Sequence, residues 1–280
     1  MKIGYCSDCH IEMGPLEIYN TEKADVLVLA GDIILASRLF DESERHFLGD
    51  REFKCTFSDR FHAFFQQVCE EFPHVIYILG NHESYHFDIA ETYSHLKEKL
   101  SYLKNLHLLE KQTLQLEDVT FIAATLWTDF NKNDPIAMLK ISYMMNDFQI
   151  ITNSNKKTDE YLTSFWSPED AYQEHLKSLE FIESELKKEE HRKVVVVTHH
   201  GPSYECVPEK YQGDMTMNPG YVSDLTNFIL DNPKIKNWIF GHSHIVKEFM
   251  IGSTTIRANC RGYAGREDMA DSFELKYFEV

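Results

Sequence analysis

The chain has 280 residues, and none of its hydrophobic runs approaches the roughly 18 consecutive apolar residues that a membrane-spanning helix needs. Residues 1–5 lead directly into a predicted strand and lack the layout of a secretory signal peptide. The sequence also has no repeat, low-complexity tract or linker that would divide it. We therefore expect a cytoplasmic protein without a membrane partner, folded as a single domain over residues 1–280.

Cysteine is sparse, with six residues in the chain, which is too few for a disulfide scaffold. Cys6 and Cys9 form a C-x-x-C pair, but no second pair follows at the spacing of a zinc ribbon. Asp8 and His10 are interleaved with this pair. We expect free thiols in a reducing compartment, with a redox role for the pair as the less favoured alternative.

Basic residues are outnumbered, with 28 Lys and Arg against 45 Asp and Glu, which gives a net charge of −17. An acidic surface repels the phosphate backbone, so long nucleic acid is an unfavourable partner unless a local basic groove exists. This charge does not exclude a small phosphorylated substrate that is held by metal ions. The composition is otherwise ordinary for a globular protein, with 43% hydrophobic and 26% charged residues.

The chain does contain a series of apolar runs that each end in polar residues. The clearest run is residues 75–79, which is typical of a buried strand and is followed by a glycine and then by Asn81, His82 and Glu83. An open α/β sheet binds its ligands at the carboxyl ends of its strands. Asn81 offers a neutral oxygen to a metal, His82 a proton donor or acceptor, and Glu83 a carboxylate that could orient His82.

Four further segments repeat this arrangement: Asp8 and His10 after residues 2–7, Asp32 after 25–30, His199 and His200 after 193–197, and His242 and His244 after 238–240. Asp-x-His and His-x-His place two side chains on the same side of an extended backbone, because the strand period is two. Carboxylate and imidazole groups that converge in this way suit a divalent metal. A loop or a satisfied core histidine explains one such residue, but it does not explain the whole series.

The rest of the sequence indicates alternating helices and strands. Helical patterns cover residues 61–72, 89–103 and 168–186, and Ser167 is the expected N-cap of the last helix. Further strands are expected at residues 106–109, 113–116, 119–126, 246–251, 254–258 and 273–280. Residues 35–60 read as a surface segment. Residues 131–163 read as irregular, either a lid over the site or an ordinary loop.

Taken in order, the five polar segments resemble the motifs of the calcineurin-like metallophosphoesterase family. That pattern is Asp-x-His, Gly-Asp, Gly-Asn-His-(Asp/Glu), a strand-terminal His and Gly-His-x-His, and it extends here from Asp8 to His244. Residues 7–12, 126–130 and 259–263 are similar to a branch of small bacterial and phage phosphoesterases. The resemblance implies an α/β fold, a four-layer α/β/β/α sandwich of two mixed sheets flanked by helices.

The resemblance also implies a centre of two divalent metal ions, with manganese favoured and iron, zinc or nickel as alternatives. The ligands it implies are Asp8, His10 and His244 for the first metal, and Asn81, His199 and His242 for the second, with Asp32 bridging both. His82 would act on the scissile phosphate as general acid or transition-state stabiliser, and Glu83 would orient it. Arg261 is the candidate for contact with the substrate phosphate. His200, which follows His199, would either support the ligands from behind or face the substrate, with a plain loop residue as the next alternative.

The activity that follows is hydrolysis of a small phosphodiester or phosphomonoester, of nucleotide type, by a metal-activated water. A phosphoprotein substrate is less expected, because the family's protein phosphatases follow Gly-Asp with further aspartate and arginine, whereas here no basic residue occurs between Asp32 and Arg38. One alternative is a nuclease of the same superfamily, against which the net charge weighs. Another is a non-catalytic scaffold, against which the complete ligand set weighs.

Overall fold

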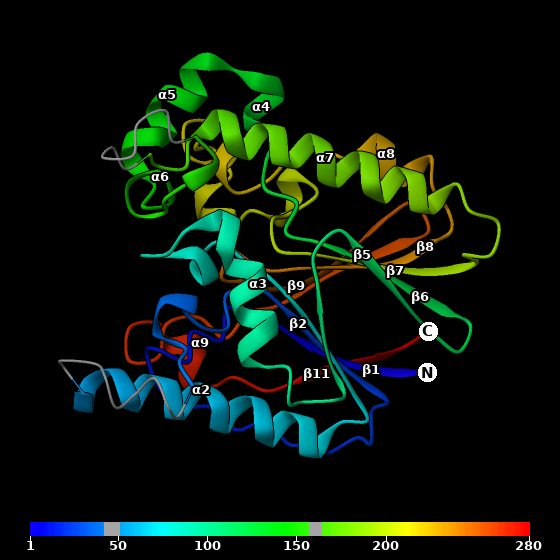
Figure 1. Cartoon of the computed structure of the whole chain (residues 1–280). Coiled ribbons are helices and arrows are strands. Elements are labelled where there is room, and N and C mark those ends of the chain that lie inside the picture. Colours follow the sequence, from blue (N-terminus) through cyan, green and yellow to red (C-terminus); the bar gives the residue numbers. More distant parts are fainter. Residues whose placement is uncertain (42–50, 157–163) are drawn as a thin grey trace.

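Two β-sheets pack face to face between two layers of helices (Figure 1). This computed structural model describes residues 1–41, 51–156 and 164–280, with only the backbone of residues 51–56. The strand order is β11-β1-β2-β3-β4 in the first sheet and β5-β6-β7-β8-β10-β9 in the second. Both sheets contain parallel and antiparallel pairs, so the predicted four-layer sandwich of two mixed sheets is confirmed.

The first sheet consists of β1 (Lys2–Cys6), β2 (Val26–Ala30), β3 (His74–Ile78), β4 (Leu106–Leu109) and β11 (Lys276–Glu279). The first four strands are parallel, and β11 pairs antiparallel with β1. The helices α2 (Arg51–Glu71) and α3 (Ile89–Lys99) cover its outer face (Figure 1). The short helix α9 (Asp268–Asp271) precedes β11.

The second sheet consists of β5 (Gln112–Leu116), β6 (Val119–Ala124), β7 (Lys193–Thr198), β8 (Ile235–Phe240), β9 (Val246–Ile251) and β10 (Thr254–Asn259). The four inner strands are parallel, whereas β5 and β9 are antiparallel edge strands. The helices α7 (Pro168–Leu186) and α8 (Thr226–Leu230) lie over this sheet (Figure 1). As predicted, Ser167 caps α7, where it accepts a hydrogen bond from the backbone of Asp170.

Alternate residues of the central strands serve different cores. In β2, Val26 and Val28 belong to the core between the sheets, whereas Leu27 and Leu29 pack beneath the helices. Strands buried on both faces need apolar residues at every position, which explains the continuous apolar runs in the sequence. Each fully buried Val or Leu side chain contributes roughly 1.5–3 kcal/mol. This burial holds the strands rigidly. The carboxyl ends of the parallel strands lie at the end of the molecule opposite the two chain termini (Figure 1).

The segment expected to be irregular, residues 131–163, contains helices instead. They are α4 (Phe130–Asn133), α5 (Pro135–Met144) and α6 (Asp147–Ile150), and residues 157–163 lie outside the described part of the chain. These helices share a small core that includes Ile141, Phe148 and Trp166. The sequence pattern missed α4 and α6 because they have four residues each, and it missed α5 because the apolar residues of that helix are not confined to one face.

Three other boundaries differ from expectation. Helix α2 begins at Arg51, so part of the expected surface segment is helical, and residues 42–50 lie outside the described residues. Helix α3 ends at Lys99 rather than 103, and β11 is shorter than the predicted strand at 273–280. Short 3₁₀ turns occupy Ala36–Arg38, His82–Ser84, Ser154–Lys156, Tyr204–Cys206, Glu209–Tyr211 and Asn218–Gly220.

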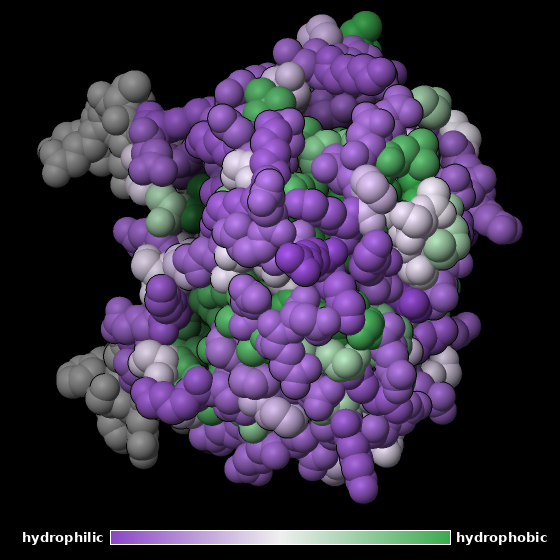
Figure 2. Space-filling model, turned by 90° about the vertical axis from the view of Figure 1, so that its right-hand side faces the viewer, coloured by the Kyte–Doolittle hydropathy of each residue, from purple (hydrophilic) through white to green (hydrophobic). Residues whose placement is uncertain are grey.

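The face of the molecule in Figure 2 is largely hydrophilic, with its hydrophobic residues scattered in small groups. This agrees with the acidic composition of the chain. Of the helices in the described ranges, none combines the length and the apolar character that crossing a bilayer requires.

Candidate metal centre

The predicted ligands follow strand ends at one edge of the sandwich. Asp8, Asp32 and Asn81 come after β1, β2 and β3 of the first sheet, whereas His199 and His242 come after β7 and β8 of the second. The two sheet edges are tied together here, because the backbone N–H of His242 donates to the carboxylate of Asp8 at 2.9 Å. The structure thus brings residues from both halves of the sequence into one site.

The backbone at these turns adopts a conformation that non-glycine residues rarely use. The φ angle is 50° at Asp8, 42° at His10, 57° at Asp32, 65° at His242 and 45° at His244. Each left-handed residue costs of order 1–3 kcal/mol and persists only where its surroundings impose it. Five such residues in the turns after strands of the two sheets indicate that these turns are shaped for the side chains they carry.

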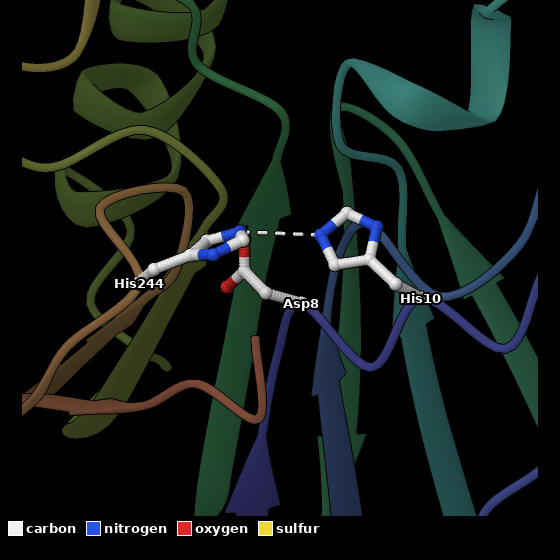
Figure 3. Close-up of side chains that lie close together, drawn as sticks. All are labelled: Asp8, His10 and His244. Carbon is white, nitrogen blue, oxygen red and sulfur yellow. Dashed lines mark hydrogen bonds and ion pairs between the residues drawn. The ribbon is translucent and has the colours of Figure 1, made fainter. Parts of the chain in front are cut away.

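Asp8, His10 and His244 form the first group of candidate ligands, and their side chains point toward one another (Figure 3). The Nε2 atoms of His10 and His244 are 3.2 Å apart, and His244 Nε2 lies 3.5 Å from Asp8 Oδ1. Asp8 and His10 are fully buried. Two imidazoles and a carboxylate therefore converge on one point.

Asp32, His199 and His242 form a second group, with Asn81 beside it. His199 Nε2 lies 3.0 Å from Asn81 Oδ1 and 3.3 Å from Asp32 Oδ1. The second carboxylate oxygen of Asp32, Oδ2, lies 3.9 Å from His10 Nε2 in the first group. Asp32 therefore stands between the two groups, with one oxygen toward each.

The hydrogen bonds around the first group fit a cation. His10 Nδ1 lies 3.1 Å from Glu12 Oε1, and His244 Nδ1 lies 2.6 Å from Glu267 Oε2. Since a carboxylate only accepts, each Nδ1 carries the proton, and a neutral ring then presents the lone pair of Nε2. Two lone pairs facing each other at 3.2 Å need a proton or a metal ion between them. Carboxylate-bound histidines of this kind are typical metal ligands.

The second group also fits a cation. His242 Nε2 is buried and has no hydrogen-bond partner within the described ranges. Burial and the neighbouring histidines hold the pKa of His242 well below its usual value, so its ring is neutral. His199 is buried too, but the carboxylate of Asp32 outweighs burial and raises its pKa to about 10. Imidazole nitrogens with carboxylate and amide oxygens are suitable ligands for divalent transition metals.

His82 lies beside both groups. Its ring stacks on Tyr85, with 4.0 Å between the ring centroids, and its Nε2 lies 3.3 Å from the hydroxyl of Tyr263 and 3.9 Å from Asp32 Oδ2. Burial lowers the pKa of His82, but Asp32 and Glu12 outweigh that effect and raise it to about 9. The ring of His82 is thus protonated at neutral pH and can act as a proton donor.

Glu83 does not lie against His82 as the sequence suggested. Its carboxylate is fully buried and accepts hydrogen bonds from four groups, the backbone N–H groups of Asp32, Ile33 and Gly80 and the hydroxyl of Tyr77. The carboxylate nearest to the imidazole belongs instead to Glu12, whose Oε1 is 3.7 Å from His82 Nδ1. The geometry therefore argues that Glu83 braces the turns after β2 and β3, and that Glu12 orients His82.

Neither predicted substrate contact lines the cavity at this site. The guanidinium of Arg261 donates to the carbonyls of Cys9, Gly14 and Pro15 at 2.9–3.0 Å, so it holds the two ends of the loop that contains His10. His200 is buried against the ring of Trp127, and burial together with His199 keeps its pKa well below the usual value. The prediction for Arg261 is corrected, whereas His200 takes the supporting position beside His199 that was one of its two main alternatives. Both side chains lie within the protein.

A cavity of about 320 Å³ opens over the two groups. Sequence reasoning missed several residues of the site: Glu12, Tyr85, Asp147, Tyr263 and Glu267. Glu12 stands two residues after the candidate ligand His10, but no spacing rule connects it to the site. Asp147 lies in the segment that was expected to be irregular, where no sequence signal marked it. Within the described ranges, no lysine or arginine lines the cavity.

Comparisons with known proteins agree with this geometry. The family model for calcineurin-like phosphoesterases matches residues 1–246. The chain is similar to an uncharacterised protein of Acanthamoeba polyphaga mimivirus, at 28% identity over 213 residues and 72% of each chain. Among solved structures it is similar to a phosphopantetheinyl hydrolase from Mycobacterium tuberculosis, with a TM-score of 0.64, 14% identity, and coverage of 99% of this chain and 95% of the other.

The structural likeness at this low identity supports the fold alone, whereas the family model spans most of the chain and every candidate ligand. The matched range begins before Asp8 and ends after His244. The family is metal-dependent, and its members act on phosphoric esters. The chain therefore belongs to the calcineurin-like phosphoesterase family, and it is a hydrolase of phosphoric ester bonds.

Proposed function

We propose that the chain is a binuclear metal-dependent hydrolase of a small phosphodiester or phosphomonoester. The observation that carries the proposal is the position of Asp32 between two groups of candidate ligands, with one oxygen directed at each. The proposed ligands are Asp8, His10 and His244 for one ion, and Asn81, His199 and His242 for the other, with Asp32 shared. Manganese is the favoured ion, with iron, zinc or nickel as alternatives.

Two divalent ions held by these residues would supply an acidified water and positive charge for the phosphate. In the overall hydrolysis, the water would lose a proton and its oxygen would bond to phosphorus, while the bond between phosphorus and the leaving oxygen would break. His82 would donate its proton to that oxygen, a contribution of about 10²–10⁴ in rate for a positioned general acid. Tyr85 fixes the plane of the His82 ring by stacking, and Glu12 would hold its Nδ1 side.

The lining of the cavity bears on the charge of the substrate. Because no lysine or arginine of the described residues lines it, positive charge for the phosphate comes from the metal ions and His82. A diester carries one negative charge and a monoester close to two, so the lining favours the diester. The same lining gives no support to the nuclease alternative, which needs a basic groove.

The test compares hydrolysis of bis(p-nitrophenyl) phosphate and p-nitrophenyl phosphate in manganese and after chelation. His82→Ala removes the proposed acid, and His107→Ala, in β4, is the matched control. We expect chelator-sensitive turnover that His82→Ala lowers by at least about 10²-fold and His107→Ala leaves intact. Folded protein without turnover in manganese, iron, zinc or nickel would contradict the proposal and favour a scaffold.

A further inference from the structure

Asp147 is a buried acid that the mechanism above does not use. It begins α6, is 1% exposed, and lines the same cavity as His82. Its Oδ1 has no hydrogen-bond partner within the described part of the chain. A buried carboxylate oxygen without a partner is unfavourable, so its place in a cavity wall points to a group that arrives with a ligand.

Apolar packing fixes the position of this carboxylate. The neighbouring residues Met145 and Phe148 are buried in the small core of α4, α5 and α6, and Ile151 closes the far end of α6. Asn81 contacts the side chain of Asp147 on one side. The carboxylate is therefore held against the cavity by its surroundings.

Three tyrosines line the cavity with Asp147. Each tyrosine ring packs on a histidine ring of the site. The distances between ring centroids are 4.0 Å for Tyr85 and His82, 4.7 Å for Tyr221 and His242, and 4.6 Å for Tyr263 and His244. Aromatic faces and a carboxylate attract an ammonium group, and cages of this composition bind quaternary ammonium ligands. An anionic substituent would meet the opposite environment, since the described lining has no lysine or arginine.

We propose that Asp147, Tyr85, Tyr221 and Tyr263 form a subsite for an alkylammonium group. The substrate class is then a phosphoester whose alcohol part carries a positive charge, and Asp147 determines that specificity. This inference rests on the proposed function of the neighbouring metal centre. The carboxylate and the tyrosines would receive the ammonium group, while the metal ions held by the candidate ligands, together with His82, would receive the phosphate.

The test uses two esters that differ in one atom. p-Nitrophenyl phosphorylcholine carries a quaternary nitrogen, and p-nitrophenyl 3,3-dimethylbutyl phosphate carries a neutral carbon in its place. With the manganese-loaded protein, we expect kcat/KM to be about tenfold or more higher for the choline ester. Equal kcat/KM for the two esters would overturn the subsite and leave the proposed hydrolase standing. Turnover of neither ester, nor of bis(p-nitrophenyl) phosphate, would overturn the hydrolase itself.

Variants assign the preference to Asp147. Asp147→Asn keeps the shape and removes the charge, so the ratio of the two kcat/KM values should fall toward one. Asp231→Asn, an exposed acid after α8, is the matched control and should keep the ratio of the unmodified protein. A ratio that Asp147→Asn leaves unchanged would contradict the assignment. Inhibition supplies a second readout, because phosphorylcholine should inhibit more strongly than 3,3-dimethylbutyl phosphate.

The ammonium group could come from a soluble ester or from a lipid headgroup. Incubation with glycerophosphocholine and, separately, with phosphatidylcholine vesicles distinguishes these sources by the products released. Release from either substrate supports the subsite, and the arm that responds identifies the source. Release from neither, combined with equal rates for the two p-nitrophenyl esters, would overturn it.

Discussion

At the scale of single residues, two glutamates near His82 have different tasks. Glu12 lies beside His10 and His82, whereas Glu83 accepts four hydrogen bonds inside the protein. The sequence could not separate them, because Glu83 is adjacent to His82 in the chain, whereas its partners Asp32 and Ile33, in the turn after β2, are distant in sequence. Burial and the nearby charge of Asp32 raise the pKa of Glu83 to about 7, so Glu83 is also a poor source of fixed charge.

This contrast predicts that two conservative changes affect different properties, stability for Glu83 and kcat for Glu12. Glu83→Gln places an amide N–H₂ against backbone donors and should lower the free energy of unfolding by about 1–3 kcal/mol. Glu12→Gln should instead lower kcat about tenfold or more, because it weakens the hydrogen bonding that orients His82 and raises its pKa. Thermal unfolding and kcat of both variants check this. A loss of kcat in folded Glu83→Gln as large as in Glu12→Gln would restore the original assignment.

A second prediction at this scale concerns pH. The pKa of His199 is raised to about 10 because Asp32 outweighs burial, so the metal-free protein holds a proton there at neutral pH. A metal ion has to displace that proton, and metal affinity should therefore rise with pH. Calorimetric titration with manganese between pH 6 and 8 should show Kd falling by up to about tenfold per pH unit for each displaced proton. A Kd independent of pH would mean that His199 is already deprotonated.

At the scale of elements, the turns after the strands carry the strain and the chemistry. The apolar runs and the glycines that follow them could be recognised in the sequence, because strand patterns and glycine turns depend on neighbouring residues alone. The short helices between 130 and 150 were not, because their stability comes from the core around Ile141 and Trp166. Helix α4 is the extreme case, since φ is positive at all four of its residues, Phe130–Asn133.

This left-handed turn predicts that glycine in place of Lys132 stabilises the protein. Lys132 is exposed and has a φ of 61°, which costs roughly 1–2 kcal/mol for a residue with a Cβ atom. Lys132→Gly should remove this cost and, after the greater entropy of the unfolded glycine, raise stability by up to about 1 kcal/mol. Lys97→Gly, in the right-handed helix α3, should lower it by about 1 kcal/mol. Denaturant unfolding of both variants measures the two signs, and a destabilised Lys132→Gly would contradict the left-handed turn.

At the scale of the molecule, the centre joins the two sheets. Asp8, His10, Asp32 and Asn81 come from the first sheet, and the other candidate ligands come from the second. The positions of most strands along the chain and the convergence of their ends follow from the sequence and the resemblance it carries, whereas the order of the strands within each sheet needed the structure. The pairing of β11 with β1 needed the structure, because it joins the two ends of the chain through a single short strand.

Metal ions that bind across the two sheets should stabilise the whole fold. An ion present at 100 times its Kd adds about 2.7 kcal/mol to the free energy of unfolding. Removal of metal by a chelator should therefore lower the Tm by several degrees. His82→Ala should keep this response to manganese, since His82 is not a proposed ligand, whereas Asp32→Ala should lose most of it. An equal response in the two variants would place the binding elsewhere.

The distribution of ligands over the two sheets also has a consequence for synthesis. Asn81 is the last candidate ligand of the first sheet, and more than a hundred residues separate it from His199. A nascent chain therefore exposes four candidate ligands on the ribosome long before their partners emerge. Neither proposed group is complete until β8 and the turn after it have left the exit tunnel, so we expect metal to bind only after residue 244 has emerged.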